Sequence, residues 1–511
     1  MLNEIHTTAG VAAGHQETAK AAVEILDAGG NAFDAAIAGF LAACVAEPVL
    51  ASLGGGGFLM AHSPDGHSKI FDFFTQTPGM PASRDDVDFH AIVADFGTAQ
   101  QEFHIGLGAV ATPGAIAGIF AVHDKLGQLP MTEIVKPAVR LAKSGLTIND
   151  FQAYLLTVVE PIYLETSEAR AQFCKMPITD GEAHIKASGD VLEFPELADF
   201  LETLAIEGAD LFYKGEVADQ IDQYAGCTIT KSDLARYQVV ERDPVNSVLR
   251  DYRVSINPPP AIGGALITLA LSMLDERVTN SATFGSVAYA RTLVSVMDAC
   301  NQARVKSGID VNPIRGAEIL KHAVSHPPSY RGTTHISVAD DEGHVAALTV
   351  SNGEGCGSII PGTGIMLNNM LGEEDLNAAG FFNWPLDTRM SSMMSPGVIV
   401  SPKGEVTGFG SGGSNRIRSA ITQFIANLSI FEMDLVAAVK SPRLHLEGGK
   451  LDIEPGFGDG TLHALAAEYE SAKVWPSSNM FFGGVHAIQR RSDGFVAGAA
   501  DHRRGGVFIP L

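Results

Sequence analysis

Four segments of the chain share one pattern, in which two stretches rich in β-forming residues flank a short turn that ends in glycine. They are residues 58–74, 335–350, 398–409 and 485–499. The turns PDG, DEG, PKG and SDG place glycine where the backbone tolerates a positive φ, which is typical of a β-hairpin. Since the hairpins lie toward both ends of the chain with helical patterns between them, they predict central antiparallel sheets covered by helices.

Helical periodicity occupies much of the sequence between these hairpins. A first helix over 18–28 is predicted to end at a glycine pair. Asn31 can cap a second helix over 32–45. Because this second helix is apolar on almost every side, we expect it to be buried. No linker or internal repeat separates independent domains. Further helices are predicted at 115–126, 132–144, 197–206, 261–274, 286–305 and 417–428.

Charge and composition exclude several classes of function. Acidic residues outnumber basic ones 59 to 35, giving a formal charge of −24, and no basic stripe offsets that field. Nucleic acids and anionic membranes are therefore poor partners, and a small-molecule substrate is expected. The longest apolar stretch, 35–46, falls short of the ~20 residues that a membrane helix needs, and no signal peptide is apparent, so a cytoplasmic location is expected. The five cysteines form no CxxC pair, and we expect no metal and no other cofactor.

The sequence Gly332-Thr333-Thr334-His335 opens the second hairpin. Paired threonines at a strand start often reflect β-propensity alone. A threonine freed at its own N-terminus, however, carries an amine of pKa about 7.7–8.0, near the optimum for a general base that activates its own hydroxyl. Glycine before it admits strained geometry and leaves its carbonyl open to attack. The alternative to a simple strand start is thus a self-cleaving site between Gly332 and Thr333.

A glycine-rich loop at 410–416 leads directly into the helical pattern at 417–428. Backbone amides at such a loop can hold an anion, either a phosphate or a developing oxyanion. The absence of G-K-[ST] disfavours a phosphate loop, and a plain capped helix start is the structural alternative. A second run, Gly54–Gly57, precedes a strand, for which close backbone packing is the better interpretation. The G-x-S-x-G, HExxH and metal-ligand spacings of other hydrolases are missing.

Read together, these segments resemble the gamma-glutamyltranspeptidase family from end to end. The resemblance includes EILDAGGNAFDAAIA, LGGGGF, ATPGAIAGI and PPPAIGGALI, becomes specific at GTTHISVADDEGHVAALT (332–349), and continues through PGTGIMLNN, MSSMMSP, GSGGSNRI and SPRLH. It implies an α+β fold, the four-layer αββα sandwich of N-terminal-nucleophile hydrolases. It also implies a proenzyme split into a large subunit, 1–332, and a small subunit, 333–511, which interlock as a heterodimer.

The resemblance further implies roles for individual residues. Thr333 matches the nucleophile, with its freed amine as the base, and Gly332–Thr333 is the cleavage site. Ser351 matches a hydroxyl that supports the nucleophile. The oxyanion hole is expected from Gly413 and Ser414, or from Gly412 and Gly413 if the loop shifts. The residues expected to bind substrate are Asn352, Glu373, Ser391 and Ser392.

The chain departs from the family at residues that are expected to bind the substrate. Phe74 stands in place of the arginine that clamps the α-carboxylate, and Met370 replaces a glutamine. Glu373 replaces the aspartate that binds the amino group, and the loop over 374–390 is shorter than usual. The residues expected to catalyse the reaction are retained, whereas several of those expected to bind the substrate are changed.

These features indicate a self-cleaving amidase that hydrolyses, or transfers to an amine, the acyl group of gamma-glutamyl-type amides through a threonyl ester. One alternative keeps the chemistry but takes a different acyl group, as in cephalosporin or glutaryl acylases. A second is an inactive binding protein, which the intact Thr333, Ser351 and glycine loop disfavour.

Overall fold

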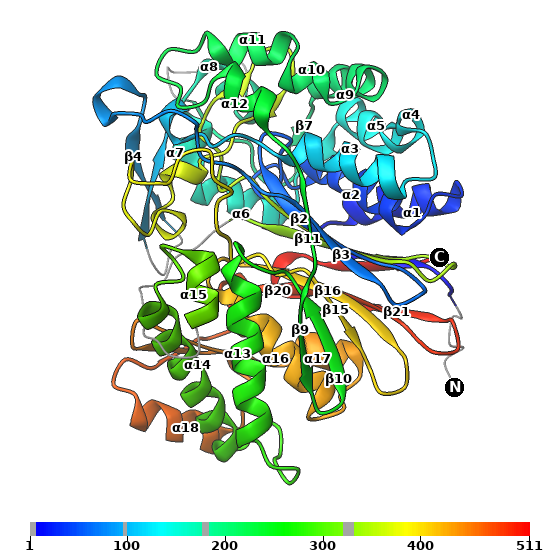
Figure 1. Cartoon of the computed structure of the whole chain (residues 1–511), viewed down its shortest axis with the longest axis vertical. Coiled ribbons are helices and arrows are strands. Elements are labelled where there is room, and N and C mark those ends of the chain that lie inside the picture. The colour runs from blue at the N-terminus through cyan, green and yellow to red at the C-terminus, as the bar shows by residue number, and fades with distance from the viewer. Residues whose placement is uncertain (1–6, 96–99, 176–182, 320–331) are drawn as a thin grey trace.

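Two antiparallel sheets lie face to face at the centre of the molecule (Figure 1). The computed structural model describes residues 7–95, 100–175, 183–319 and 332–511. The first sheet has seven strands and places the hairpin that follows Thr333 at its middle. In spatial order its strands are β22 (Val507–Pro510), β1 (Gly10–Ala13), β11 (Thr334–Ala339), β12 (Val345–Ser351), β2 (Gly56–His62), β3 (Ser68–Phe73) and β8 (Val240–Arg242).

The second sheet has six strands and packs against β11 and β12 of the first. Phe58 and Met60 of β2 join the same apolar cluster as Phe409, while the intervening Leu59 joins a separate cluster. This alternation follows from the two-residue period of a strand that is buried on both faces. The strands in order are β21 (Val496–Ala499), β20 (Gly484–Arg490), β16 (Val406–Gly412), β15 (Gly397–Val400), β10 (Tyr252–Ile256) and β9 (Val245–Leu249).

Helices cover the outer face of each sheet, which gives the αββα order that the family resemblance implies (Figure 1). Over the first sheet lie α1 (Gln16–Asp27), α2 (Ala32–Ala46) and α3 (Ala115–Leu126), and α5 (Lys136–Ser144) packs against α2. Over the second lie α13 (Ile262–Arg277), α16 (Arg416–Ser429) and α17 (Leu435–Lys440), and α14 (Val287–Ser307) packs against α13. No described helix is both long and apolar enough to span a bilayer.

The remaining elements extend these layers at their ends. The helices are α4 (Met131–Ile134), α6 (Asp150–Val158), α7 (Glu160–Tyr163), α8 (Ser167–Phe173), α9 (Pro195–Glu207), α10 (Asp210–Tyr213), α11 (Glu216–Asp222), α12 (Lys231–Arg236), α15 (Pro313–Ile319) and α18 (Asp459–Glu468). The short strands are β4 (His90–Asp95), β5 (Gln100–Ile105), β6 (Leu146–Thr147), β7 (Val191–Leu192), β13 (Ile359–Ile360), β14 (Ile365–Met366), β17 (Leu444–Glu447), β18 (Lys450–Ile453) and β19 (Lys473–Val474).

All four hairpin predictions are confirmed, as β2–β3, β11–β12, β15–β16 and β20–β21. The buried helix after Asn31 is also confirmed, because every residue of α2 is buried and Asn31 caps it through Phe33 and Asp34 amides. The single helix predicted at 132–144 is wrong, since α4 and α5 are separate. Pro137 lies in the first turn of α5, where its missing N–H costs nothing, but it could not continue a helix from α4.

The run Gly54–Gly57 packs backbone against backbone, as its sequence predicts. A Cβ added to Gly55 would lie 2.3 Å from the Ser351 carbonyl oxygen, and one added to Gly57 would lie 2.5 Å from the Thr349 carbonyl oxygen. Side chains at these positions would push β2 away from β12. The run therefore brings β2 close to the end of β12, where Ser351 lies.

Candidate active site

Thr333 lies at the entry to β11, in the middle of the first sheet, and is almost fully buried. Thr333 lines a small pocket. The polar residues that line this pocket with it are Ser351, Glu373, Ser392 and Ser414. The apolar ones are Phe74, Met370, Leu376, Met393, Met394 and Ile417. The structure thus brings together residues from six separate stretches of sequence that the resemblance assigns to one site.

Gly332 is held from three directions. Its carbonyl accepts a hydrogen bond from Ser351 Oγ at 2.5 Å, and its amide donates to Glu354 Oε1 at 2.9 Å. A Cβ on residue 332 would lie 2.4 Å from the Gly353 carbonyl oxygen and 2.8 Å from that of Val49, so only glycine fits. Ser351 therefore contacts the carbonyl that self-cleavage would attack, a contact that the sequence did not predict for it.

The glycine loop follows β16 and lies close to Thr333. Gly412 pairs with Gly484 as the last residue of the strand, and a Cβ there would lie 2.3 Å from the Thr333 carbonyl oxygen. Gly413 has φ +121° and Ser414 φ +53°, both in the region that favours glycine. In the described chain, neither amide bonds to a backbone or side-chain acceptor, and Ser414 Oγ also lacks a partner. Gly412 belongs to the ladder, whereas Gly413 and Ser414 lie beyond its end.

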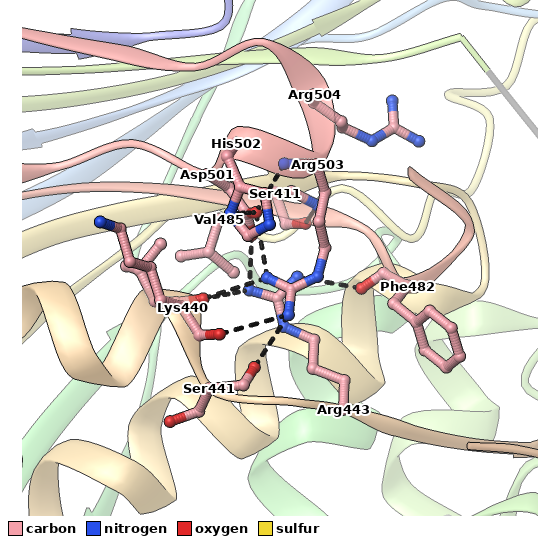
Figure 2. A network of polar contacts seen from close by, with 12 residues as sticks. Ser411, Lys440, Ser441, Arg443, Phe482, Val485, Asp501, His502, Arg503 and Arg504 are labelled. Carbon is pink, nitrogen blue, oxygen red and sulfur yellow. Dashed lines mark hydrogen bonds and ion pairs between the residues drawn. The ribbon is translucent and has the colours of Figure 1, made fainter. Parts of the chain in front are cut away.

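A buried network of charged side chains contacts β20 next to this loop (Figure 2). Arg443 donates to Asp501 at 2.6 Å, and Arg503 pairs with the same carboxylate at 3.0 Å. Asp501 also accepts from the Val485 amide on β20, next to the residue that pairs with Gly412. Burial alone would raise the pKa of Asp501, but the two guanidinium groups outweigh it and hold the pKa well below its usual range.

Two further buried charged residues contact Thr333 and the residue after it. Arg504 donates to the Thr333 carbonyl at 3.4 Å, and burial lowers the pKa of its guanidinium to about 10. On the opposite face of β11, Thr334 Oγ1 donates to Glu47 at 2.7 Å, and Thr18 donates to the same carboxylate at 2.8 Å. Burial raises the pKa of Glu47. Successive strand residues point to opposite faces, which is why Thr333 faces the pocket while Thr334 faces the helices.

The predicted substrate-binding residues divide into two groups. Phe74, Glu373 and Ser392 line the pocket. Ser391 does not line it and is only half-buried. Asn352 is fully buried outside the lining, and its side-chain amide has no hydrogen-bond partner among the described residues.

Arg389 lies close to Phe74 but is committed elsewhere. Its guanidinium donates to the Phe74 carbonyl, to Tyr237 Oη and to the Gln238 carbonyl. It also lies 4.6 Å from the centre of the Tyr237 ring and 3.6 Å from Asp72. A side chain with this many partners is not available to bind a substrate in the pocket.

His335, the last residue of the T-T-H motif, is structural. It is fully buried, and its ring nitrogens bond Thr349 Oγ1 at 2.7 Å and Ser337 Oγ at 2.8 Å. Burial lowers the pKa of His335 well below its usual value. In the described part of the chain, no group of three or more histidine, cysteine or acidic side chains is arranged to hold a metal ion.

Comparison with known proteins decides the family. The sequence model of the gamma-glutamyltranspeptidase family matches residues 18–326 and 314–511. The chain belongs to this family. It is 32% identical to the glutathione hydrolase proenzyme of Escherichia coli (strain K12), over 94% of this chain and 88% of that one. It is 28% identical to the acylase ACY 1 proenzyme of Pseudomonas sp. (strain SE83), over 98% and 93%.

The gamma-glutamyltranspeptidase family is an enzyme family, and the two relatives above are named as proenzymes. A solved structure confirms the predicted fold. The crystal structure of cephalosporin acylase from Bacillus halodurans superposes with a TM-score of 0.82 at 22% identity, covering 99% of this chain and 96% of that one. The relatives thus include proteins named as glutathione hydrolases and proteins named as acylases.

Some residues of this site were not identified from the sequence. Glu354 follows Ser351 by three positions, yet nothing in the loop distinguishes it from a solvated acid. Glu47 and Arg504 lie nearly 300 and more than 150 residues from Thr333 in sequence, so only the fold brings Arg504 to the Thr333 carbonyl and Glu47 to the neighbouring Thr334 hydroxyl. An acid or base inside an otherwise apolar and glycine-rich segment is the one signal that marks Glu47.

Proposed function

We propose that this protein is a self-cleaving amidase that uses Thr333 as its nucleophile and acts on gamma-glutamyl-type amides. The observation that carries the proposal is the short contact between Ser351 Oγ and the Gly332 carbonyl, immediately before a buried threonine that lines the pocket. A hydrogen bond to that oxygen polarises the carbonyl toward attack. Membership of a family of proenzymes adds independent support.

Self-cleavage follows from this arrangement in two steps. Thr333 Oγ attacks the Gly332 carbonyl carbon, the C–N bond breaks, and the hydroxyl proton passes to the nitrogen to give an ester and a free amine. Water then hydrolyses the ester, which leaves a Gly332 carboxylate and restores the Thr333 hydroxyl. The products are the fragments 1–332 and 333–511, about 35 and 19 kDa when the 53.8 kDa mass is divided by length. We expect them to remain together as a heterodimer, because β11 and β12 lie between β1 and β2.

Turnover repeats the chemistry on an external amide. The freed Thr333 amine takes the hydroxyl proton as oxygen attacks the substrate carbonyl, and the amine returns it to the leaving nitrogen. The amides of Gly413 and Ser414 stabilise the oxyanion, and water or an acceptor amine releases the acyl group from the ester. A cytoplasmic location stays a prediction.

The experiment that tests this function is a comparison of wild type with Thr333→Ala. Purified wild-type protein should migrate as two bands of about 35 and 19 kDa, whereas the mutant should remain one chain without amidase activity. A single uncut chain that is fully active would show that the mechanism is wrong.

A second candidate is an acylase that takes an acyl group other than gamma-glutamyl. Phe74 and Met370 line the pocket with apolar surface, where the family resemblance leads one to expect an arginine and a glutamine. Relative rates on gamma-glutamyl and other acyl anilides distinguish the two candidates.

A further inference from the structure

Arg504 is a buried arginine that lacks an ion-pair partner among the described residues. Its Nε has no hydrogen-bond partner there, and its two hydrogen bonds, both to backbone carbonyls, are long at 3.4 and 3.5 Å. The preceding Arg503, by contrast, pairs with Glu454 at 2.6 Å and with Asp501 at 3.0 Å (Figure 2). A buried charge without a close partner destabilises a fold, so the place of Arg504 beside the nucleophile points to a function.

The guanidinium of Arg504 lies against the backbone around the reaction centre. Its Nη1 donates to the Thr333 carbonyl at 3.4 Å. A Cβ added to Gly412 would lie 3.0 Å from Nη1, and one added to Gly413 would lie 3.4 Å from Nη2. Since the nitrogen and the carbonyl oxygen of one residue lie within about 4 Å of each other, the guanidinium is within about 7 Å of the Thr333 nitrogen. Cleavage before Thr333 turns this nitrogen into a free amine.

Acidic side chains approach the nucleophile from other directions. Glu47 accepts from the Thr334 hydroxyl at 2.7 Å, and Glu354 accepts from the Gly332 amide at 2.9 Å. Glu373 lines the pocket. Where they are ionised, these carboxylates favour the protonated form of the amine, which cannot act as a base. The charged groups that face Arg504 itself are Arg416, Arg443, Asp501 and Glu47, and the nearby histidines, His335 and His486, are neutral because burial lowers the pKa of each.

We propose that Arg504 keeps the freed Thr333 amine unprotonated at neutral pH, so that this amine can accept the proton of the Thr333 hydroxyl. The inference rests on the proposed function, because the amine exists only after self-cleavage. Two like charges close together repel, and a fixed guanidinium therefore disfavours the ammonium form. At an effective dielectric constant of about 20, a unit charge about 7 Å away lowers the pKa of an amine by about one unit or more. Burial lowers the pKa of Arg504 only to about 10, so the guanidinium keeps its charge at neutral pH.

The test measures kcat/KM against pH in self-cleaved protein, with whichever of the gamma-glutamyl, glutaryl and butyryl p-nitroanilides it hydrolyses fastest. Arg504→Gln removes the charge, and the acid limb of the profile should move up by about one pH unit. Arg504→Lys keeps the charge and should leave the limb in place. Arg491→Gln, the same change at an exposed arginine, should also leave it in place. A residue that only supports the fold would lower the activity without moving the limb.

A measurement on wild type alone covers the case in which Arg504→Gln fails to fold or to cleave itself. The acid limb of wild type should have an apparent pKa below about 7.7, the lower end of the range for an unperturbed α-amine. A wild-type limb at or above that value, or a limb that Arg504→Gln leaves in place, would show that the inference is wrong while the amidase function stands. If Thr333→Ala is as active as wild type, the proposed function fails and the inference fails with it.

Discussion

Replacing Ser351 by alanine removes the hydroxyl that donates to the Gly332 carbonyl at 2.5 Å. If this contact stabilises the oxyanion of self-cleavage, its loss should slow cleavage by about 10²–10³-fold, the cost of removing one oxyanion donor. The assay follows the disappearance of the 53.8 kDa chain on a denaturing gel after synthesis. Ser351→Thr is the matched control, because it keeps the hydroxyl and should cleave within about tenfold of wild type.

Stability has to be separated from chemistry in this experiment. Ser351 Oγ also accepts a hydrogen bond from the Gly353 amide at 3.1 Å, and a buried amide left without its acceptor costs about 1–3 kcal/mol. Melting curves of Thr333→Ala and of the Thr333→Ala, Ser351→Ala double mutant, both uncut, measure that cost directly. Cleavage of Ser351→Ala at the wild-type rate would refute the assignment, whatever the melting temperature.

Four further outcomes are expected. kcat/KM should fall at acid pH as the Thr333 amine protonates. Dialysis against a chelator should leave the rate unchanged, and an activity that is lost on dialysis and restored by zinc would contradict the metal-free mechanism. Asp501→Ala should lower the free energy of unfolding in urea by about 3–5 kcal/mol, because it leaves two buried guanidinium groups without their shared carboxylate. The same change at the exposed Asp493 should leave the free energy of unfolding nearly unchanged. Burial would raise the pKa of Glu447, but Arg418, His445 and Arg304 outweigh it and hold the pKa at about 2. The carboxylate therefore stabilises the fold above its unfolded pKa of about 4.3, and this contribution should be lost as the pH falls from about 4.3 to about 2. The loss should appear as a drop in melting temperature that Glu447→Gln does not show. Phe74→Arg should lower KM for gamma-glutamyl anilide at least tenfold, and an unchanged KM would show that a cation at this position does not reach the donor.

The fold could be predicted from local patterns because most of its elements carry their own signals. The turns that end in glycine fixed the four hairpins, and Asn31 with Asp34 marked the start of α2 through a reciprocal cap. The break between α4 and α5 was missed because apolar periodicity continues across it, and only Pro137 shows that the chain cannot remain helical there. Pairing between sheets depends on contacts across hundreds of residues, which local patterns do not carry.

The site could be predicted only in part, because a motif identifies residues but not their partners. Thr333, Ser351, Glu373, Ser392 and Ser414 were all expected near one another, and the pocket brings them together. The partner of Ser351 was not predictable, since the hydroxyl bonds the Gly332 carbonyl rather than the side chain of Thr333.

Arg389 shows why a lost residue in a binding site is not simply replaced by another of the same charge. In sequence it lies two residues before Ser391, which makes it look able to substitute for the missing clamp. In the fold, its guanidinium is enclosed by Tyr237 and Asp72 and donates to the backbone of Phe74 itself. Releasing it would leave Asp72 with one fewer cation and expose the polar edge of a buried tyrosine, at the cost of several hydrogen bonds of about 1.5–3 kcal/mol each. A single ion pair with a substrate carboxylate cannot offset that loss, so Arg389 stays bound to the chain behind Phe74 and does not replace the missing clamp.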